Sequence, residues 1–329
     1  MKDLISNFSD QIAEALDTID GLNLKAPKTE IHNVVITGLG GSGIGGTLVA
    51  DLVAPTATVP VMVNKDYMLP GFVGKNTLVI ACSYSGNTEE TLSATKQALK
   101  SGAEVACITS GGELYEIAKG GGLNVITMRG GNPPRSMFAY SFSFLCYYME
   151  FYGIAKLTVQ KDLEAAVRLI NAEEADTLVE AERMSSHLKG HIPVVYAVNG
   201  NLGIAARWRQ QFNENAKMLS WEAAVPEMNH NELVGWEGGS NDYAAIFLRN
   251  ETDYNRNQKR IEINKSIIGE KTNQVLELWS KGNSAIERAL YLVHFGDWVS
   301  YYLSEINQVD IMDIKSIDLL KSELSKLPV

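Results

Sequence analysis

The sequence predicts an α/β protein made of two units, each a parallel sheet flanked by helices. The chain has 329 residues, which is too long for one ordinary core and about right for two domains. Short apolar runs alternate with helical patterns, and most of these runs are apolar on both faces, as parallel strands buried between helix layers are. The order of a strand, a glycine-containing turn and a helix starts again after residue 190.

The first unit is predicted to cover residues 1–155. It begins with an amphipathic surface helix over 3–20, and an aromatic helix over 136–152 closes it. Five apolar runs between these helices predict strands at 33–37, 59–63, 77–83, 104–109 and 123–128. The third strand leads into a helical pattern that ends at a glycine, a common stop signal.

The second unit is predicted to cover residues 191–329, after a charged helical linker over 156–190. A strand at 193–198 leads through a glycine-containing turn into a helix over 204–218. Further segments follow along the chain, with strands at 243–248 and 274–279, a long helix over 284–307 and a C-terminal helix. The two halves therefore look like two copies of one plan.

Charge and hydropathy exclude several classes of protein. The net charge of −10 argues against a nucleic-acid partner, which would need a basic face. The most apolar segment, 136–149, is shorter than the ~20 residues that span a bilayer, so no membrane partner is expected. The acidic, amphipathic N-terminal segment does not resemble a signal peptide. We therefore expect a cytoplasmic protein.

The three cysteines are too few and too scattered for a disulfide framework or a CxxC metal site. Cys82 and Cys107 lie in apolar runs, and we expect them to be buried thiols. No set of His, Cys and Asp residues has the spacing of metal ligands, so the sequence predicts neither a metal nor a cofactor.

A dense glycine loop, GLGGSGIGG, follows the first strand. It contains G-x-G-x-x-G as Gly38, Gly40 and Gly43, the fingerprint of a dinucleotide-binding turn. The fit is partial, because the next strand ends in Asn64 and Lys65 rather than in an acidic residue. A tight turn would explain some of the six glycines. We favour a loop whose backbone closely approaches a ligand, with the Ser42 hydroxyl added.

Hydroxyl groups are concentrated after the third strand, in the stretch SYSGNTEETL. Ser83, Ser85 and Thr88 precede a helix start, where free N–H groups and the helix dipole favour an anion. The alternative is simple helix capping by Ser85 or Asn87. The glycine and hydroxyl loops would lie side by side at the carboxyl edge of the sheet. This pattern favours a phosphate cradle.

These loops resemble the sugar isomerase (SIS) domain of the phosphoglucose isomerase superfamily. Two such domains, with GGNPPRSMFAY, QFNENAKM and PEMNHNELVGWE, resemble the bifunctional phosphoglucose/phosphomannose isomerase family. The resemblance implies two SIS domains, each a parallel sheet flanked by helices. It also implies a small phosphosugar substrate, held through its phosphate by Gly41, Ser42, Gly43, Ser83, Ser85 and Thr88.

The resemblance further implies catalytic roles for four residues. Glu214 would move a proton between C1 and C2, and Arg135 would stabilise the enediolate. His230 would help to open the sugar ring from the neighbouring subunit, which implies a homodimer. From the residues alone, a solvated helix carboxylate at Glu214 and a surface histidine at His230 would be the more common roles.

A C-terminal lysine would complete the set in the family. Lys315 is favoured over Lys321, because Ile311, Ile314 and Ile317 surround it and predict a buried side. Gln308 lies seven residues earlier, where conventional phosphoglucose isomerases carry glutamine and bifunctional archaeal relatives carry threonine. The smaller threonine is thought to permit rotation about C2–C3, so Gln308 argues against the mannose activity.

The sequence therefore predicts an enzyme that interconverts glucose 6-phosphate and fructose 6-phosphate, with mannose 6-phosphate as an open second substrate. One alternative is a phosphosugar-binding regulator without catalysis. Another is a nicotinamide dehydrogenase, which the missing acidic residue after Val63 argues against.

Overall fold

The first of two sheets in the computed structural model, which describes residues 1–327, is parallel throughout, as predicted. In spatial order its strands are β2 (Val61–Asn64), β1 (Asn33–Thr37), β3 (Thr77–Ser83), β4 (Glu104–Thr109) and β5 (Asn124–Thr127). The bounds of β1 and β3 agree with the predicted strands 33–37 and 77–83. The order reverses between β1 and β3, which places their carboxyl ends at the switch point of the sheet.

Neighbouring residues of the central strands face two different helix layers. Val34 and Ile36 join the core formed with α2 (Phe8–Asp20), α3 (Gly40–Val53) and α6 (Phe138–Phe151). Val35 between them joins the core formed with α4 (Glu89–Lys100) and α5 (Gly112–Gly121). Because each face has its own helix layer, the central strands carry apolar residues on both faces, as the sequence indicated.

The second sheet repeats this topology. Its strands are parallel, in the order β7 (Trp221–Val225), β6 (Ile192–Val198), β8 (Tyr243–Arg249) and β9 (Val275–Trp279). The first, second, third and fourth strands of each half therefore occupy equivalent places, which confirms the expectation of two copies of one plan.

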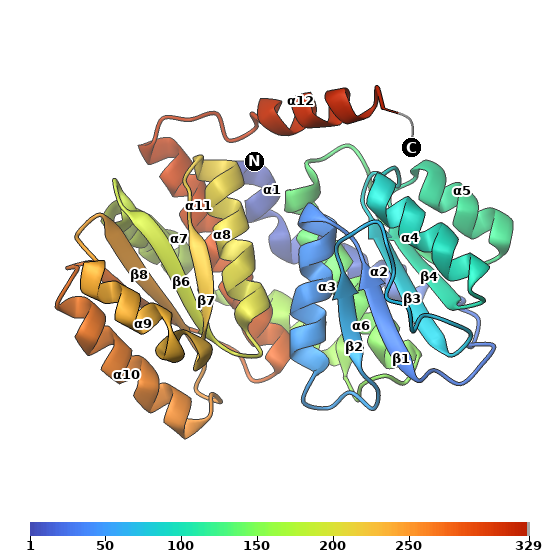
Figure 1. Ribbon diagram of the computed structural model, residues 1–329, viewed down its shortest axis with the longest axis horizontal. Helices are drawn as coiled ribbons and strands as arrows, with labels where there is room; N and C mark the ends of the chain where they lie inside the picture. Colours follow the sequence, from blue (N-terminus) through green and yellow to red (C-terminus); the bar gives the residue numbers. More distant parts are fainter. Residues whose placement is uncertain (328–329) are drawn as a thin grey trace.

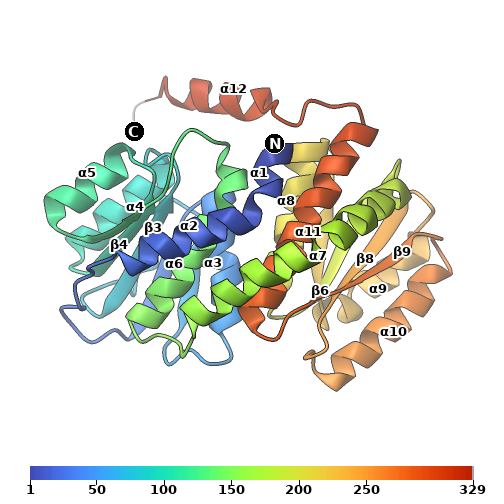
Figure 2. The same cartoon turned by 180° about the vertical axis from the view of Figure 1, so that it is seen from behind.

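The two sheets share one core between them (Figure 1). Its helices from the second half are α7 (Val159–Leu188), α8 (Leu202–Ala216) and α11 (Ala285–Ile306), whereas α9 (Glu232–Gly235) and α10 (Asn255–Gly269) lie on the outer face. Helix α7 covers most of the predicted linker, and it packs along α11 and against α2 (Figure 2). Helix α7 is thus a packed element of this core, and the division of the chain into two domains at residues 155 and 190 stays a prediction.

Several elements escaped prediction for physical reasons. Strand β7 is a half-exposed edge strand, and its Glu222 pairs with Arg209, so it lacks the apolar run of a buried strand. Helix α5 has glycines at both ends, and α10 has only three buried residues. The predicted helix over 3–20 is divided at Asn7 into α1 (Lys2–Ser6) and α2.

The cysteines are buried and free, as expected for Cys82 and Cys107, and Cys146 is buried with them. Burial raises the pKa of the Cys107 thiol to about 12. Its reactive thiolate form is therefore scarce at neutral pH.

The last helix, α12 (Lys315–Leu324), has no buried residue and lies above the first half, joined by a stretch of chain to the end of α11 in the second half (Figure 1). Three short helical turns complete the fold, namely η1 (Pro134–Met137), η2 (Glu227–His230) and η3 (Trp236–Gly238). Among residues 1–327, no helix combines the length and apolar character needed to cross a bilayer.

Candidate active site

A cavity of about 270 Å³ lies where the first sheet's carboxyl edge meets α8 of the second half. Residues from both halves line it: Gly40, Gly41, Arg135, Arg207, Gln210, Gln211, Asn213, Glu214 and Ile317. Three of these, Gly41, Arg135 and Glu214, were predicted as site residues from the sequence. A larger cavity of about 340 Å³, at the carboxyl ends of β6 and β8, contains none of the predicted site residues.

Packing within the protein explains most of the glycine loop, contrary to our preference for a loop shaped by a ligand. A Cβ on Gly43 would lie 2.2 Å from the Gly38 carbonyl oxygen, and one on Gly46 would lie 2.7 Å from Ile36. A Cβ on Gly41 would lie 3.1 Å from the Pro134 carbonyl, so this glycine lets α3 approach the segment that carries Arg135. The glycines therefore position the site through close backbone contacts.

The start of α3 retains only part of the phosphate-binding role predicted for it. The Gly43 N–H donates to the Leu39 carbonyl at 3.0 Å, so it is not free for a phosphate. Gly41 lies in the first turn, where N–H groups have no acceptor within the helix. The Ser42 hydroxyl accepts a hydrogen bond from the backbone N–H of Tyr84 at 3.0 Å, which joins the glycine loop to the hydroxyl loop.

The hydroxyl loop is internally ordered and leaves the next helix uncapped. Ser83 is 1% exposed, and its hydroxyl lies 2.9 Å from that of Thr88 and accepts from the Gly86 N–H at 3.1 Å. Ser85 is exposed and accepts from the Asn87 N–H at 3.2 Å, so its own proton remains available. Within residues 1–327 no side chain caps α4, so the capping alternative is wrong.

Asn87 instead accepts from the Glu113 N–H at 2.9 Å, at the start of α5. The first N–H groups of α4 therefore remain available to an anion. Within the hydroxyl loop, Ser85 is exposed and Thr88 is half-buried, whereas Ser83 is buried and orders the loop.

Arg135 and Glu214 meet across the two halves of the chain. Arg135 is 3% exposed, and its Nη1 donates to Glu214 Oε1 at 2.8 Å. Its Nε donates to Asn215 Oδ1 at 2.7 Å, and its Nη2 donates to the Ile311 carbonyl at 2.6 Å. Burial lowers the pKa of Arg135, and the carboxylate of Glu214 opposes that decrease. The Glu214 side chain is 30% exposed, so the cavity holds an accessible carboxylate beside a fixed cation.

His230 lies outside this cavity, at the exposed end of η2. Neither neighbouring carboxylate is hydrogen-bonded to it within residues 1–327. Glu232 accepts from Tyr196 and Trp221, and Glu227 accepts from Asn231. The carboxylates thus hold the loop, while the imidazole faces outward.

The expectation that Lys315 lies on a buried side is wrong. Lys315 is the first residue of α12, its side chain is 89% exposed, and its Nζ pairs with Asp313 at 2.9 Å. That hydrogen bond raises the pKa of Lys315. Lys321 on the same helix is also exposed, and Ile317 is the α12 residue that lines the cavity. The apolar spacing predicted burial, but α12 packs against no core that would use it.

Gln308 is also exposed, and it lies two residues beyond the end of α11 with a positive φ of 54°. It does not line the cavity between Arg135 and Glu214. This position gives no support to the argument that glutamine fills the space required by mannose substrates.

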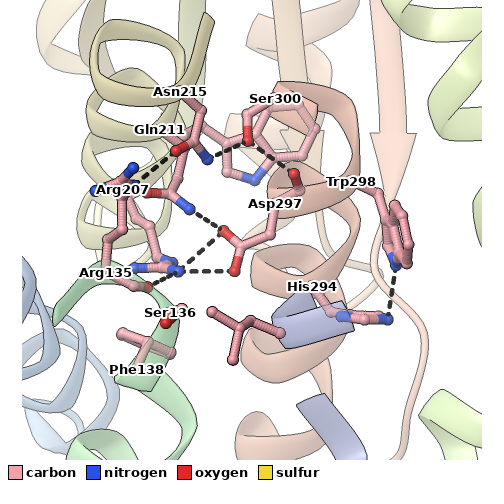
Figure 3. A network of polar contacts seen from close by, with 12 residues as sticks. Arg135, Ser136, Phe138, Arg207, Gln211, Asn215, His294, Asp297, Trp298 and Ser300 are labelled. Atoms are coloured by element: carbon pink, nitrogen blue, oxygen red, sulfur yellow. Dashed lines mark hydrogen bonds and ion pairs between the residues drawn. The ribbon is translucent and has the colours of Figure 1, made fainter. Parts of the chain in front are cut away.

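Sequence reasoning missed the buried polar residues behind Arg135, which Figure 3 shows. They are Arg207, Gln211 and Asn215 on α8 and Asp297 and Ser300 on α11. A signal was present, because the three α8 residues are spaced by four and so form one stripe on an otherwise apolar helix face.

Comparisons with known proteins first define a class. Residues 29–143 match the family model described as SIS domain, and residues 178–324 match the one described as bacterial phospho-glucose isomerase C-terminal SIS domain. The fold resembles the C-terminal domain of glucosamine-fructose-6-phosphate aminotransferase from Francisella tularensis, with a TM-score of 0.75, 12% identity and coverage of 94% and 96% of the two chains. It also resembles tagatose-6-phosphate ketose/aldose isomerase from Escherichia coli, with a TM-score of 0.70, 14% identity and coverage of 95% and 96%. The protein is therefore a double-SIS-domain protein.

Sequence relatives identify the family. The bifunctional phosphoglucose/phosphomannose isomerase of Caldicellulosiruptor bescii is 36% identical over 99% of both chains. That of Aquifex aeolicus is 36% identical over 91% of this chain and 92% of its own. This chain belongs to the bifunctional phosphoglucose/phosphomannose isomerase family. A D-glucosamine-6-phosphate 4-epimerase from Sulfolobus acidocaldarius is also similar, at 33% identity over 70% of this chain and 72% of its own.

Removal of the Ser85 hydroxyl should weaken phosphosugar binding. Ser85→Ala should raise KM about tenfold and change kcat little, because a hydrogen bond to phosphate is worth about 1.5–3 kcal/mol and is made equally in the ground and transition states. Steady-state kinetics would measure both constants. Ser186→Ala, an exposed serine on α7, is the control. An unchanged KM in Ser85→Ala would remove Ser85 from the phosphate site.

Proposed function

We propose that this protein interconverts glucose 6-phosphate and fructose 6-phosphate by proton transfer through an enediolate. The proposal extends to mannose 6-phosphate, because the relatives at 36% identity are named for both activities. The observation that carries it is the contact of 2.8 Å between Arg135 Nη1 and the accessible carboxylate of Glu214. A base beside a fixed cation suits a reaction that creates an anion next to the base.

The proton transfer between C1 and C2 needs one carboxylate as the base and one cation beside it. Glu214 takes the proton from C1 of open-chain fructose 6-phosphate, and the electron pair forms the C1–C2 double bond. The resulting charge on the C2 oxygen is stabilised by the guanidinium of Arg135. A proton also passes from the C1 hydroxyl to the neighbouring C2 oxygen, which moves the negative charge to the C1 oxygen. The protonated Glu214 then delivers its proton to C2, the C1–C2 double bond becomes single and the C1 oxygen forms the aldehyde carbonyl, which gives the aldose. The step is redox-neutral overall, so it requires no cofactor.

We assign the phosphate of the substrate to the two loops at the carboxyl ends of β1 and β3. The accessible hydroxyls of Ser85 and Thr88, the uncapped start of α4 and the first turn of α3 support this assignment. Ser42 and Ser83 support the loops through their hydrogen bonds to Tyr84, Gly86 and Thr88. Hydroxyls and backbone donors bind a dianion without adding charge, which suits a substrate that must also leave.

We further propose a homodimer in which His230 opens the sugar ring in the active site of the neighbouring subunit. His230 is exposed and lies outside the cavity of its own chain. It lies beside exposed apolar residues of the same region, since Trp221 is 38% and Val234 is 65% exposed. Strand β7, which contains Trp221, is also a free sheet edge. Lys315 would assist ring opening only after its pair with Asp313 opens, and Lys321 remains its alternative.

A cytoplasmic location is part of the same proposal, because three free, buried thiols suit a reducing compartment. A phosphosugar-binding regulator would use the same cradle but would have no need for a base paired with a buried guanidinium.

The decisive assay is incubation with fructose 6-phosphate, with glucose 6-phosphate and mannose 6-phosphate quantified separately. We expect both products, and Glu214→Gln should lower kcat about 10³-fold while phosphosugar binding persists, because the amide cannot accept the proton. Glu116→Gln, on an exposed part of α5, is the control. Binding without turnover in the unmodified protein would favour the regulator. Turnover of glucosamine 6-phosphate alone would favour an epimerase activity.

Subunit complementation tests the shared active site. Glu214→Gln and His230→Ala should each be inactive alone, and their random mixture should recover about a quarter of the wild-type activity, because one site of each mixed dimer is complete. A mixture of Glu214→Gln with Arg135→Ala should recover nothing, because both residues belong to the same cavity. No recovery in the first mixture would place His230 outside the neighbouring site.

A further inference from the structure

We infer that Asn215, Ser300, Arg207 and Asp297 are positioning residues that fix the guanidinium of Arg135 in its catalytic orientation. They do so from the second half of the chain, whereas Arg135 lies on η1 of the first half (Figure 3). The catalytic purpose of this orientation rests on the proposed function. The contacts themselves do not depend on any substrate.

The first branch of the network orients the side chain of Arg135. Its Nε donates to Asn215 Oδ1 at 2.7 Å, and Asn215 Nδ2 donates to Ser300 Oγ at 2.9 Å. The Ser300 hydroxyl donates its single proton to the Asp297 carbonyl at 2.7 Å. Ser300 can therefore only accept from Asn215, which forces the amide to present its oxygen to Arg135. Both Asn215 and Ser300 are 0% exposed, so water cannot substitute for either partner.

The second branch holds the backbone of Arg135. Arg207 Nη2 donates to the Arg135 carbonyl at 3.1 Å and to the two carboxylate oxygens of Asp297 at 2.9 and 2.7 Å. Gln211 Nε2 also donates to this carboxylate, at 2.8 Å. The ring of Phe138 lies 4.4 Å from the Arg207 guanidinium carbon. The carbonyl and the Nε of Arg135 are thus held by two routes that both end on α11.

Stability alone does not account for this network. Buried ion pairs are often no more stabilising than apolar residues of similar volume, because both charges lose their hydration. The Nε of Arg207 is also buried and has no hydrogen-bond partner in the described part of the chain, which is a further cost. The network instead fixes the direction in which each donor of the Arg135 guanidinium points. The Nε, Nη1 and Nη2 of Arg135 each have one fixed acceptor, on Asn215, Glu214 and Ile311 respectively.

Glu214 and Asn215 are consecutive on α8, so one turn of helix supplies both the base and the group that orients its cation. A change at Ser300 frees the amide of Asn215 to rotate and loosens Arg135 relative to Glu214. It leaves the phosphate loops untouched, because these belong to β1, β3 and their following helices. Loss of Ser300 should therefore lower kcat and spare KM.

The test compares two buried serines on α11. Ser300 and Ser304 are 0% and 1% exposed, and each donates to the carbonyl three residues earlier, but only Ser300 contacts Asn215. Ser300→Ala should lower kcat about tenfold with KM within about twofold of wild type, whereas Ser304→Ala should change neither by more than about twofold. In an Arg135→Lys background, which lacks the Nε donor, Ser300→Ala should have almost no further effect. An equal loss in both backgrounds, or an unchanged kcat in folded Ser300→Ala, would overturn the inference.

A readout without substrate separates this inference from the proposed function. The ¹⁵N–¹H signal of Arg135 Nε, assigned by its absence in Arg135→Lys, should be protected from solvent exchange in the wild type and in Ser304→Ala. In Ser300→Ala it should lose that protection. A wild-type protein that shows this pattern but no isomerisation would refute the function and retain the network. Protection that persists in Ser300→Ala would refute the network, whatever the activity.

Discussion

The guanidinium of Arg135 connects the two halves of this protein, and the geometry of the site depends on it. Arg135 belongs to the first half, on the turn η1 that leads into α6. Its acceptors lie on α8 and in the loop between α11 and α12. Burial of this cation is costly unless each donor is satisfied, so its three acceptors must lie where they do. The contacts of Arg135 therefore fix the relative placement of the two halves and the position of Glu214 together.

The rest of the fold serves that constraint. Helices of both halves share one continuous core, which keeps η1 against α8. Gly41 allows α3 to lie against the backbone of Pro134 and Arg135, where a Cβ would be only 3.1–3.2 Å from it. Gly40 and Gly41, after the carboxyl end of β1, then line the same cavity that α8 closes from the other side. The phosphate loops and Arg135 belong to the first half and Glu214 belongs to the second, so the substrate would bridge the two halves.

The sequence was most informative where local pattern decides structure. The bounds of β1 and β3 were predicted correctly because their uninterrupted apolar runs reflect burial on both faces. It was least informative where tertiary packing decides. The spacing of Ile311, Ile314 and Ile317 suggested a buried face for Lys315, but α12 lies over the other elements without entering a core. The glycine loop looked like a ligand loop, yet four of its six glycines make close contacts, with Cys82, Gly38, Ile36 and Pro134, which no local pattern reveals.

The sequence likewise predicted only part of the candidate site. Arg135 and Glu214 were found through the family resemblance, and the structure brings them within hydrogen-bond distance. Ser300 and Asp297 were missed because their partners on the neighbouring helix are not visible in the sequence, and Asn215 was missed although its spacing with Arg207 and Gln211 was a signal.

The central claim is that Glu214 moves a proton through an enediolate stabilised by Arg135. The most direct measurement is the isomerisation of fructose 6-phosphate in D₂O, with the position of deuterium in the glucose 6-phosphate determined by NMR. A carboxylate that exchanges its proton with solvent between the two transfers predicts deuterium at C2 of the product. Complete absence of deuterium at C2, at full turnover, would indicate direct hydride transfer between the carbons and would contradict the account.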